Sequence, residues 1–312
     1  MEFGLATLLR DGEYIGALEV AEAFWPLGEL RDNGVALPSD DVKQLLTIWP
    51  AAFPQLQGAA AICASGKLPG TIAIPRAVAR LDVPIRFPNK LLGVGGNYAD
   101  HLTEMGMLPK RIEPMAIFTR PPTTTMVGPG KTVVMPRKHK QLDWEIELAV
   151  VIGAHMSHVS PGEAMAGVAG YTVGIDLSVR DLARQADVPF RDVFRAKCQD
   201  TMCPVGPVVR PAVFVPNPHE LTMKLTVNGV LRQHASTGEM LYRIEEQLSI
   251  ISEVVRLEPG DVVLTGTPFG SGVHHGFFLK PGDRITAEIE RVGTLQVEVV
   301  HCRSVLAASY AT

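Results

Sequence analysis

The chain has 312 residues, of which 46% are hydrophobic and 20% charged, so it can bury a sizeable core as one large domain or as a large domain with a smaller appendage. Its net charge of -4 and its single short basic run, residues 136–140, predict no nucleic-acid surface, and a basic turn is the simpler interpretation of that run. No stretch approaches the ~18 apolar residues of a membrane span, and the N-terminal residues do not resemble a signal peptide, so we expect a cytoplasmic protein that binds no membrane.

Residues 1–80 are predicted to form a small N-terminal domain rich in Gly, Pro and Ala. Residues 14–20 have the pattern of a strand, and residues 41–48 that of a helix capped by Asp40 and limited by Pro50. No set of His, Cys or acidic side chains converges in this part of the sequence. Packing or an oligomer contact is therefore its expected role.

Residues 91–104 combine a short apolar strand, a Gly-rich bend and a polar helical turn. The glycines fit neither the dinucleotide-binding fingerprint nor the Walker pattern. His101 and Glu104 are three residues apart, so on a helical turn they share a face and can form a hydrogen bond. A carboxylate that fixes one imidazole nitrogen leaves the other available as a base. A surface ion pair is the alternative interpretation.

An acidic strand follows a proline-rich stretch whose residues 105–113 could form either a mobile lid or a static surface loop. Asp143, Glu145 and Glu147 alternate with apolar residues, so they are expected to share one face of a strand that continues into the apolar run 148–152. Neighbouring carboxylates at the edge of a core repel one another unless a cation lies between them, and a hard divalent metal ion is the usual solution. The alternative is a solvated acidic strand face.

The next elements bring a further carboxylate to the end of a strand. Residues 160–163 predict a helix start with a capping box, and residues 170–176 predict a strand that ends at Asp176. A helical stretch, residues 177–185, then carries Arg180. An acid at a strand end followed by an arginine is a usual place for site chemistry, although a helix cap is an equally good interpretation of Asp176.

The C-terminal third is rich in strands. Residues 221–234 predict a hairpin with a type I′ Asn-Gly turn, residues 242–255 an amphipathic helix, residues 262–270 a buried strand ending in a polar turn, and residues 284–300 a closing hairpin. The main domain has few helices and lacks a regular alternation of strands and helices. It is therefore predicted to be α+β and strand-rich rather than doubly wound.

Taken together, these motifs resemble the fumarylacetoacetate hydrolase family, and within it the fumarylpyruvate and acylpyruvate hydrolase-like branch. The similarity extends in order over roughly residues 88 to 300, and its segments are residues 95–104, 143–148, 170–181, 197–200, 203–207, 257–261 and 265–268. The resemblance implies a mixed β-sandwich roll as the catalytic domain, residues 88–312, next to the small N-terminal domain.

The resemblance also implies a metal site. The metal-binding carboxylates of the family fall on Glu145, Glu147 and Asp176, which would hold Mg²⁺ or Mn²⁺, or the Ca²⁺ that some members use. Three carboxylates leave open positions for a chelating substrate and for water, which suits a hard ion.

Catalytic and substrate-binding residues follow from the same resemblance. His101 and Glu104 would orient and deprotonate a water molecule, and Lys197 would stabilise an enolate or a substrate carboxylate. Arg180 and Thr267 fall where the family holds the acid end of its substrate. The expected partner is a small-molecule oxo acid, and because the family is usually dimeric we expect a homodimer.

The activity implied is metal-dependent hydrolysis of a carbon–carbon bond in a 1,3-dicarbonyl acid, as in the catabolism of aromatic compounds. The same site would also serve a decarboxylase of a 2-oxo acid such as oxaloacetate or a 2-hydroxydienoate isomerase, and a non-catalytic binding protein is a further alternative. Gly96 stands where the family more often has a larger apolar residue, and Ala183 stands where many members have a substrate-contacting glutamine. These departures leave the metal site intact and favour a differently shaped or more apolar ligand.

Overall fold

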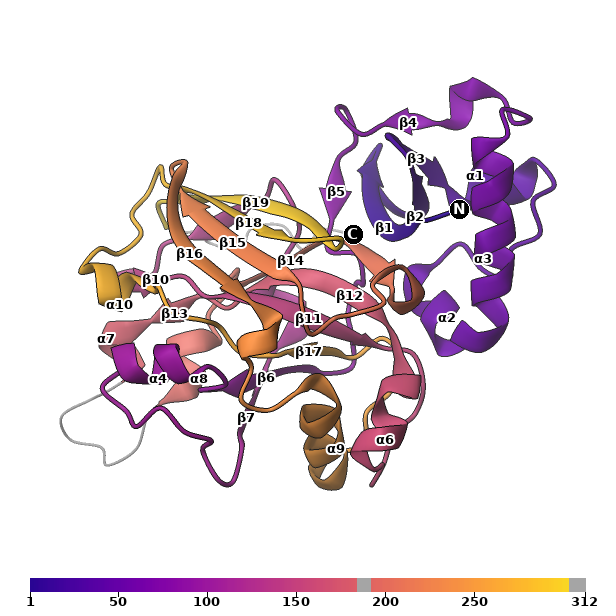
Figure 1. Ribbon diagram of the computed structural model, residues 1–312. Helices are drawn as coiled ribbons and strands as arrows, with labels where there is room; N and C mark the ends of the chain where they lie inside the picture. Colours follow the sequence, from indigo (N-terminus) through magenta and orange to yellow (C-terminus); the bar gives the residue numbers. More distant parts are fainter. Residues whose placement is uncertain (184–191, 303–312) are drawn as a thin grey trace.

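The structure of the protein is a computed structural model that describes residues 1–183 and 192–302. It has the strand-rich α+β fold that the sequence predicts, built around mixed sheets (Figure 1). Among the described residues, no helix has the length and apolar character needed to cross a membrane.

Twelve strands of the described chain form one large mixed sheet, ten of them in the order β4-β3-β2-β1-β14-β12-β11-β17-β6-β7, with β5 beside β1 and β8 beside β14. The strands are β1 (Gly4–Arg10), β2 (Glu13–Val20), β3 (Ala23–Pro26), β4 (Ile74–Pro75), β5 (Leu81–Asp82), β6 (Leu91–Gly95), β7 (Ala116–Arg120), β8 (Met126–Val127), β11 (Ile146–Ile152), β12 (Val168–Ile175), β14 (Cys203–Pro211) and β17 (Val262–Leu264).

Strand β11 lies near the middle of this sheet and is buried along its whole length, as the apolar run 148–152 predicts. Its side chains alternate between two cores. Leu148 and Val150 pack into the larger core, whereas Ala149 and Val151 pack into a core shared with the N-terminal unit. Both faces of the sheet are therefore covered at this strand.

A second sheet closes the larger core. It has the order β16-β15-β18-β19-β9. Its strands are β9 (Thr132–Val134), β15 (Thr222–Val227), β16 (Val230–Ser236), β18 (Arg284–Ile289) and β19 (Gly293–Val300), and a separate two-stranded ladder joins β10 (Leu142–Asp143) to β13 (Ser178–Val179). Both predicted hairpins are confirmed, and Asn228 and Gly229 have the positive φ angles, 53° and 78°, that a type I′ turn requires.

The N-terminal unit carries three helices on its outer side (Figure 1): α1 (Leu27–Asp32), α2 (Val42–Thr47) and α3 (Trp49–Ala64). The predicted cap of the second helix is wrong by one residue, because the side chain of Asp41, and not of Asp40, accepts the backbone N–H of Gln44 at 2.7 Å. As predicted, this helix ends before Pro50, at Thr47. Pro50 itself occupies the first turn of the next helix, α3, where a missing N–H costs nothing.

The large sheet continues across the predicted boundary between the two domains. Strand β1 pairs with β14, with Leu5 opposite Val209. Glu19 on β2 is 3% exposed and pairs with Arg210 on β14 at 2.6 Å. The division into residues 1–80 and 88–312 stays a prediction, and residues 303–312 lie outside the described chain.

The remaining helices are short except for α9, and they lie around the ends of the strands (Figure 1). They are α4 (Ala99–Glu104), α5 (Pro122–Thr125), α6 (Pro161–Ala164), α7 (Arg180–Ala183), α8 (Val193–Lys197), α9 (Ile244–Val254) and α10 (Gly272–His275), with 3-10 turns η1 (Gly70–Ile72), η2 (Met165–Gly167), η3 (Ala212–Phe214) and η4 (Thr237–Glu239). The capping box of Ser160 and Glu163 is confirmed. The expected helix over residues 177–185 is interrupted by β13, and residues 184–185 lie outside the described chain.

Candidate active site

The three predicted metal ligands lie together where two central strands of the large sheet, β11 and β12, begin and end. In the antiparallel pair β11–β12, Ile146 lies opposite Ile175, so the start of β11 meets the end of β12. Just beyond that pair, the backbone N–H of Asp176 donates to the carbonyl of Glu145 at 2.8 Å. Carboxylate oxygens of Glu145, Glu147 and Asp176 lie within 4.8 Å of one another.

This carboxylate triad has the chemistry of a site for a hard divalent cation. Its members are 3%, 2% and 1% exposed, and they offer only oxygen ligands. Burial and the charge on Glu145 raise the pKa of Glu147 to about 8. Burial also disfavours the charged form of Glu145, but Lys197 and Arg180 hold the pKa of Glu145 well below its ordinary value. A divalent cation would favour the charged form of all three acids, so these residues fit a metal ion.

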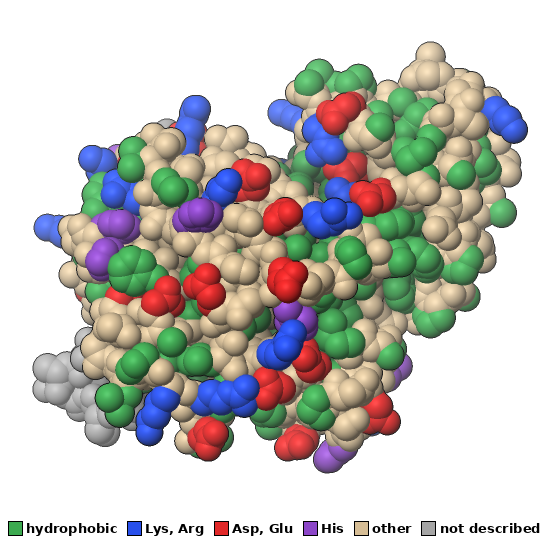
Figure 2. Space-filling view, viewed as in Figure 1, with side chains coloured by type: hydrophobic (Ala, Val, Ile, Leu, Met, Phe, Trp, Pro, Cys, Tyr) green, Lys and Arg blue, Asp and Glu red, His purple; other side chains and the backbone are tan. Residues whose placement is uncertain are grey.

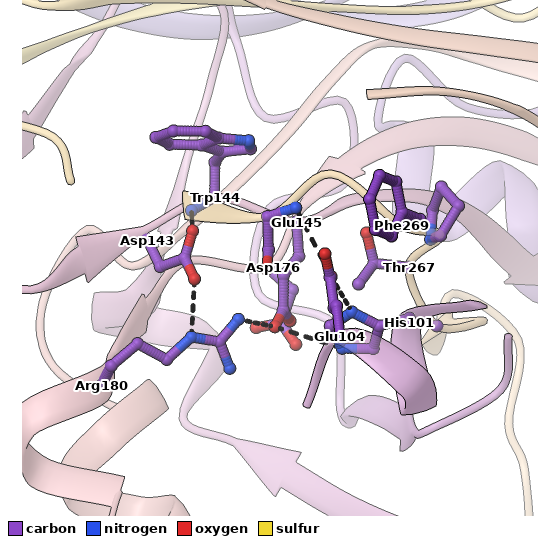
Figure 3. A network of polar contacts seen from close by, with 12 residues as sticks. His101, Glu104, Asp143, Trp144, Glu145, Asp176, Arg180, Thr267 and Phe269 are labelled. Carbon is purple, nitrogen blue, oxygen red and sulfur yellow. Dashed lines mark hydrogen bonds and ion pairs between the residues drawn. The ribbon is translucent and has the colours of Figure 1, made fainter. Parts of the chain in front are cut away.

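Two basic side chains converge on the same carboxylates. Lys197, at the end of α8, directs Nζ to Glu145 at 2.7 Å and also to Asp176. Arg180, at the start of α7, binds Asp143 through Nε at 2.7 Å and Glu145 through Nη2 at 2.6 Å (Figure 3). These contacts bring both predicted residues to the triad. Their roles toward a substrate remain predictions.

His101 and Glu104 share one face of α4, as their spacing predicts, and Nδ1 of His101 lies 2.5 Å from Oε1 of Glu104. The backbone N–H of Gly270 donates to Oε2 of Glu104 at 3.0 Å. Burial opposes the ionisation of Glu104, but the hydrogen bonds from His101 and Gly270 hold its pKa below the ordinary value. Nε2 of His101 lies 4.0 Å from Oε1 of Glu145, and Figure 3 shows His101 and Arg180 on opposite sides of the carboxylates.

Thr267 lies in the polar turn after β17 and is 3% exposed. Its hydroxyl accepts a hydrogen bond from Nε2 of Gln233 at 3.0 Å. The same amide group donates to the carbonyl of Pro268 at 2.8 Å and accepts the backbone N–H of Ile146 at 2.9 Å. Gln233 therefore ties the turn that carries Thr267 to the start of β11, a link that the sequence analysis missed.

Arg120 is a further residue of this region that the sequence analysis missed. It ends β7, is 1% exposed and forms an ion pair with Asp176. Its guanidinium also donates to the carbonyls of Met202 at 2.9 Å, of Leu177 at 3.1 Å and of Lys197. Arg120 thus fixes the segments that carry two of the predicted site residues. The available signal was a charged residue at the end of a short apolar strand.

Asp143 does not join the carboxylate triad, although the alternating pattern predicts a face shared with Glu145. It lies on β10 rather than on β11, because the chain leaves the strand conformation between them. Its buried carboxylate accepts hydrogen bonds from Arg180 and from the backbone N–H groups of Trp144 and Gly272. Burial raises the pKa of Asp143, and Arg180 opposes that rise. Asp143 therefore orients Arg180.

Seven of the eight predicted site residues line one cavity of about 400 Å³, and the exception is Glu104. Segments far apart in the sequence meet there: β6 and α4, the strand β7, the start of β11, the end of β12, α7, α8 and the turn after β17. The arrangement places a buried oxygen-ligand set, a histidine whose second nitrogen is held by a carboxylate, and an ammonium group around the same space. Such a set can bind a chelating oxo acid and move a proton on it.

The fold and this cavity define the class of the protein as an enzyme built on a strand-rich roll with a buried carboxylate triad. The sequence model described as "Fumarylacetoacetate (FAA) hydrolase C-terminal" matches residues 90–300. The chain therefore belongs to the fumarylacetoacetate hydrolase family, as its motifs implied.

Relatives within the family differ in their activities. The chain is 40% identical to "Oxaloacetate tautomerase FAHD2B, mitochondrial" of Bos taurus over 230 residues. The aligned region covers 73% of this chain and 71% of that protein. Maleylpyruvate hydrolase from Sphingobium sp. SYK-6, solved with manganese(II) and pyruvate, has a TM-score of 0.76 and 29% identity, covering 97% of this chain and all of that one (100%). The 2-hydroxyhepta-2,4-diene-1,7-dioate isomerase from Mycobacterium marinum has a TM-score of 0.67 and 28% identity, covering 97% and 100%.

Proposed function

We propose that the protein is a divalent-metal-dependent hydrolase that cleaves a carbon–carbon bond in a 1,3-dicarbonyl acid of the acylpyruvate type. One observation carries the proposal: the His101–Glu104 pair lies directly beside the carboxylate triad, with Nε2 of His101 4.0 Å from Glu145. A base next to a set of oxygen ligands is what water activation on a chelated oxo acid needs.

The chain's own residues account for the proton movements. With Nδ1–H donated to Glu104, Nε2 of His101 is free to take a proton from water, whose oxygen adds to the acyl carbonyl carbon. The bond between that carbon and C3 of the pyruvyl group then breaks. Its electron pair stays on the pyruvyl part as an enolate, and the proton on His101 returns to C3. The products are a carboxylic acid and pyruvate.

The other site residues would hold the charge that develops. Lys197 places an ammonium group among the carboxylates, where it can stabilise an enolate oxygen. A bound Mg²⁺ or Mn²⁺ ion, held by Glu145, Glu147 and Asp176, would supply Lewis acidity toward the oxo-acid end of the substrate. The manganese in the maleylpyruvate hydrolase structure supports this part of the proposal.

A second candidate is a keto–enol tautomerase or decarboxylase that acts on oxaloacetate, or an isomerase that moves a proton without breaking a carbon–carbon bond. The 40% identity to an oxaloacetate tautomerase favours it. His101 would then exchange a proton with carbon C3 of the oxo acid, and no attacking water would be needed. A homodimer, a cytoplasmic location and a role in the catabolism of aromatic compounds remain predictions.

A panel of substrates separates the two candidates. The ultraviolet absorbance of acetylpyruvate, fumarylpyruvate and enol-oxaloacetate is followed with Mg²⁺ or Mn²⁺ and with excess chelator. The hydrolase proposal expects metal-dependent loss of an acylpyruvate with one equivalent of pyruvate formed. Turnover of oxaloacetate alone, by tautomerisation or by release of CO₂, would transfer the assignment to the second candidate.

Variants test the role of the base. His101→Ala is expected to lower kcat by about 10²- to 10⁴-fold, the usual contribution of general base catalysis. His155→Ala is the matched control, because His155 is exposed and follows the opposite end of β11. Undiminished turnover in His101→Ala, with the control unchanged, would remove His101 from the mechanism.

A further inference from the structure

We propose that the cavity beside the carboxylate triad binds the non-reacting end of the substrate as an uncharged, apolar group. The substrate is then a 2-oxo acid or acylpyruvate with an alkyl or aryl tail, and not one with a second carboxylate at its far end. This inference rests on the proposed function in one respect, because it places the oxo-acid end of the substrate at the triad.

The first support is the apolar lining of the cavity. Away from the triad its walls are formed by α4 and the loop after it, by β7, and by the facing ends of α7 and α8. The side chains that these elements contribute include Leu102, Met105, Met107, Ile112, Phe118 and Val193. Apolar walls with a small polar cluster at one end fix which end of a ligand goes where.

The second support is that the basic side chains of the described lining are already paired with carboxylates. Among the described residues that line the cavity, the basic side chains are His101, Arg180 and Lys197. His101 is bound to Glu104, Arg180 to two carboxylates, and Lys197 to two carboxylates of the triad. All three lie at the triad end. A distal carboxylate would therefore be desolvated in the apolar part without a partner from the described lining, which is costly.

The third support is that the apolar wall is held in place. Arg111, in the loop that carries Met107 and Ile112, forms two hydrogen bonds to Glu246 on α9, at 2.9 and 3.1 Å. The carbonyl of Ile112 accepts the hydroxyl of Tyr242 at 3.0 Å. These bonds hold the second half of the loop against α9 and the segment that precedes it, and they turn the guanidinium of Arg111 toward Glu246.

Gly96 lets this wall close. It has a φ of 67°, and a Cβ atom added there would lie 2.6 Å from Cδ1 of Ile112 and 3.0 Å from Cδ2 of Leu102. Ile112 and Leu102 therefore pack directly over the glycine backbone. Both side chains line the cavity.

Binding of two matched acids tests the inference without any turnover. Titration calorimetry on the Mn²⁺-loaded protein compares 2-oxooctanoate with 2-oxooctanedioate, which differ only by the terminal carboxylate, and uses pyruvate as the reference. Each buried methylene is expected to tighten binding about fourfold. We expect 2-oxooctanoate to bind more tightly than pyruvate and at least tenfold more tightly than the dioate.

The outcomes separate two failures. If pyruvate binds and the dioate binds as tightly as 2-oxooctanoate or more so, the inference is overturned while the oxo-acid site stands. If none of the three acids binds, the proposed function fails and the inference fails with it. The same order of preference is expected in kcat/KM for hexanoylpyruvate over fumarylpyruvate.

A charge placed in the wall should reverse the preference. Met107 lines the cavity, so Met107→Arg puts a guanidinium in its wall. The dissociation constant of 2-oxooctanedioate divided by that of 2-oxooctanoate is then expected to fall to one or below. Leu108→Arg is the matched control, because Leu108 is the next residue, is 70% exposed and does not line the cavity. An unchanged ratio in Met107→Arg, or the same change in both variants, would show that the tail lies elsewhere.

Discussion

Glu145 and Glu147 lie two residues apart, yet their electrostatic surroundings differ. Glu145 is paired with Arg180 and Lys197, and these charges hold its pKa low against the effect of burial. Glu147 accepts the backbone N–H of Gly266 at 2.6 Å, and burial together with Glu145 raises its pKa to about 8. Residue identity alone predicts two equivalent ligands, whereas the neighbours favour the charged form of Glu145 and disfavour the charged form of Glu147.

Glu104→Gln tests the buried carboxylate at the residue scale. The folded-state pKa of Glu104 is lowered, so its charge stabilises the fold above about pH 4.5, and that contribution disappears as the pH falls through the lower folded value. The variant is therefore expected to unfold at a lower temperature than the parent at pH 7, and the difference is expected to be smaller at pH 3. Thermal unfolding at both pH values measures this.

The control for that experiment is Glu253→Gln, which changes an exposed acid on α9. Its unfolding temperature is expected to follow that of the parent at both pH values. A gap between Glu104→Gln and the parent that widens as the pH falls would contradict the assigned direction of the pKa shift.

Arg120→Met removes the buried guanidinium that holds Asp176 and three carbonyl groups. Breaking a buried ion pair by removing one partner costs roughly 3–5 kcal/mol, so the free energy of unfolding in urea is expected to fall by about that amount. Arg195→Met is the control, because Arg195 is exposed and its ion pair with Asp192 should contribute at most about 1 kcal/mol. Equal losses in the two variants would contradict the structural role of Arg120.

At the scale of elements, β6 and β7 meet where Gly93 lies opposite Phe118. A Cβ atom on Gly93 would lie 2.4 Å from the ring of Phe118, so only glycine allows the ring to lie across this strand. The same ring lies 5.2 Å from Nζ of Lys197 and lines the cavity. The packing of two strands therefore sets the position of one wall of the site.

Gly93→Ala is expected to destabilise the protein by about 1–3 kcal/mol through overpacking, and to change ligand binding because the ring must move. Gly58→Ala is the matched control. It lies on the exposed side of α3, where an added Cβ meets nothing within 4 Å, so a change between zero and about 1 kcal/mol in the stabilising direction is expected. Denaturant unfolding measures the free energy of unfolding of both variants. A Gly93→Ala variant as stable as Gly58→Ala would contradict the packing argument.

In the segment after β17, backbone groups bond to side chains of the site instead of to a neighbouring strand. As predicted, the buried strand ends in a polar turn, and β17 stops at Leu264, directly before that turn. Beyond it, backbone N–H groups of Gly266 and Gly270 donate to Glu147 and Glu104, and the carbonyl of Gly270 accepts Nε1 of Trp144. Backbone groups that serve side chains cannot also form a sheet ladder.

On the scale of the whole molecule, the N-terminal unit and the catalytic part share one sheet and one core. The ladder β1–β14 and the buried pair Glu19–Arg210 join them. Figure 2 shows apolar side chains gathered over the helices of the N-terminal unit, and Ile48 and Ile62 are 41% and 36% exposed. A partner surface there would agree with the predicted homodimer, which stays a prediction.

The shared sheet predicts that both parts unfold together. Trp25 and Trp49 report on the N-terminal unit, and Trp144 reports on the site. Tryptophan fluorescence is followed in urea for two variants, Trp144→Phe and the double variant Trp25→Phe with Trp49→Phe. Each fluorescence curve is compared with the far-ultraviolet circular dichroism curve of the same variant. In each variant the fluorescence and dichroism midpoints are expected to coincide. Fluorescence of the N-terminal pair that changes well before the dichroism would show that the unit unfolds independently.

Local patterns predicted much of the fold and the candidate ligands. The alternation and apolar runs that predict β11 and β12 are local properties of the backbone, and so are the Asn-Gly hairpin turn and the capping box at Ser160. The His101–Glu104 pair follows from helical spacing in the same way. Helix boundaries were less accurate, as at Asp41, because adjacent acids compete for one cap with similar propensities.

By itself, the sequence determined the strand-rich class and, through motifs that each combine residue types at short spacing, the family. The resemblance also made Glu145, Glu147 and Asp176 the predicted metal ligands. Only the tertiary structure decided that Arg120 lies buried against Asp176, that Asp143 turns away to Arg180, and that the cavity wall is apolar. The physical reason is that these contacts join residues tens of positions apart, and their energies depend on burial and on neighbouring charge, which no local pattern encodes.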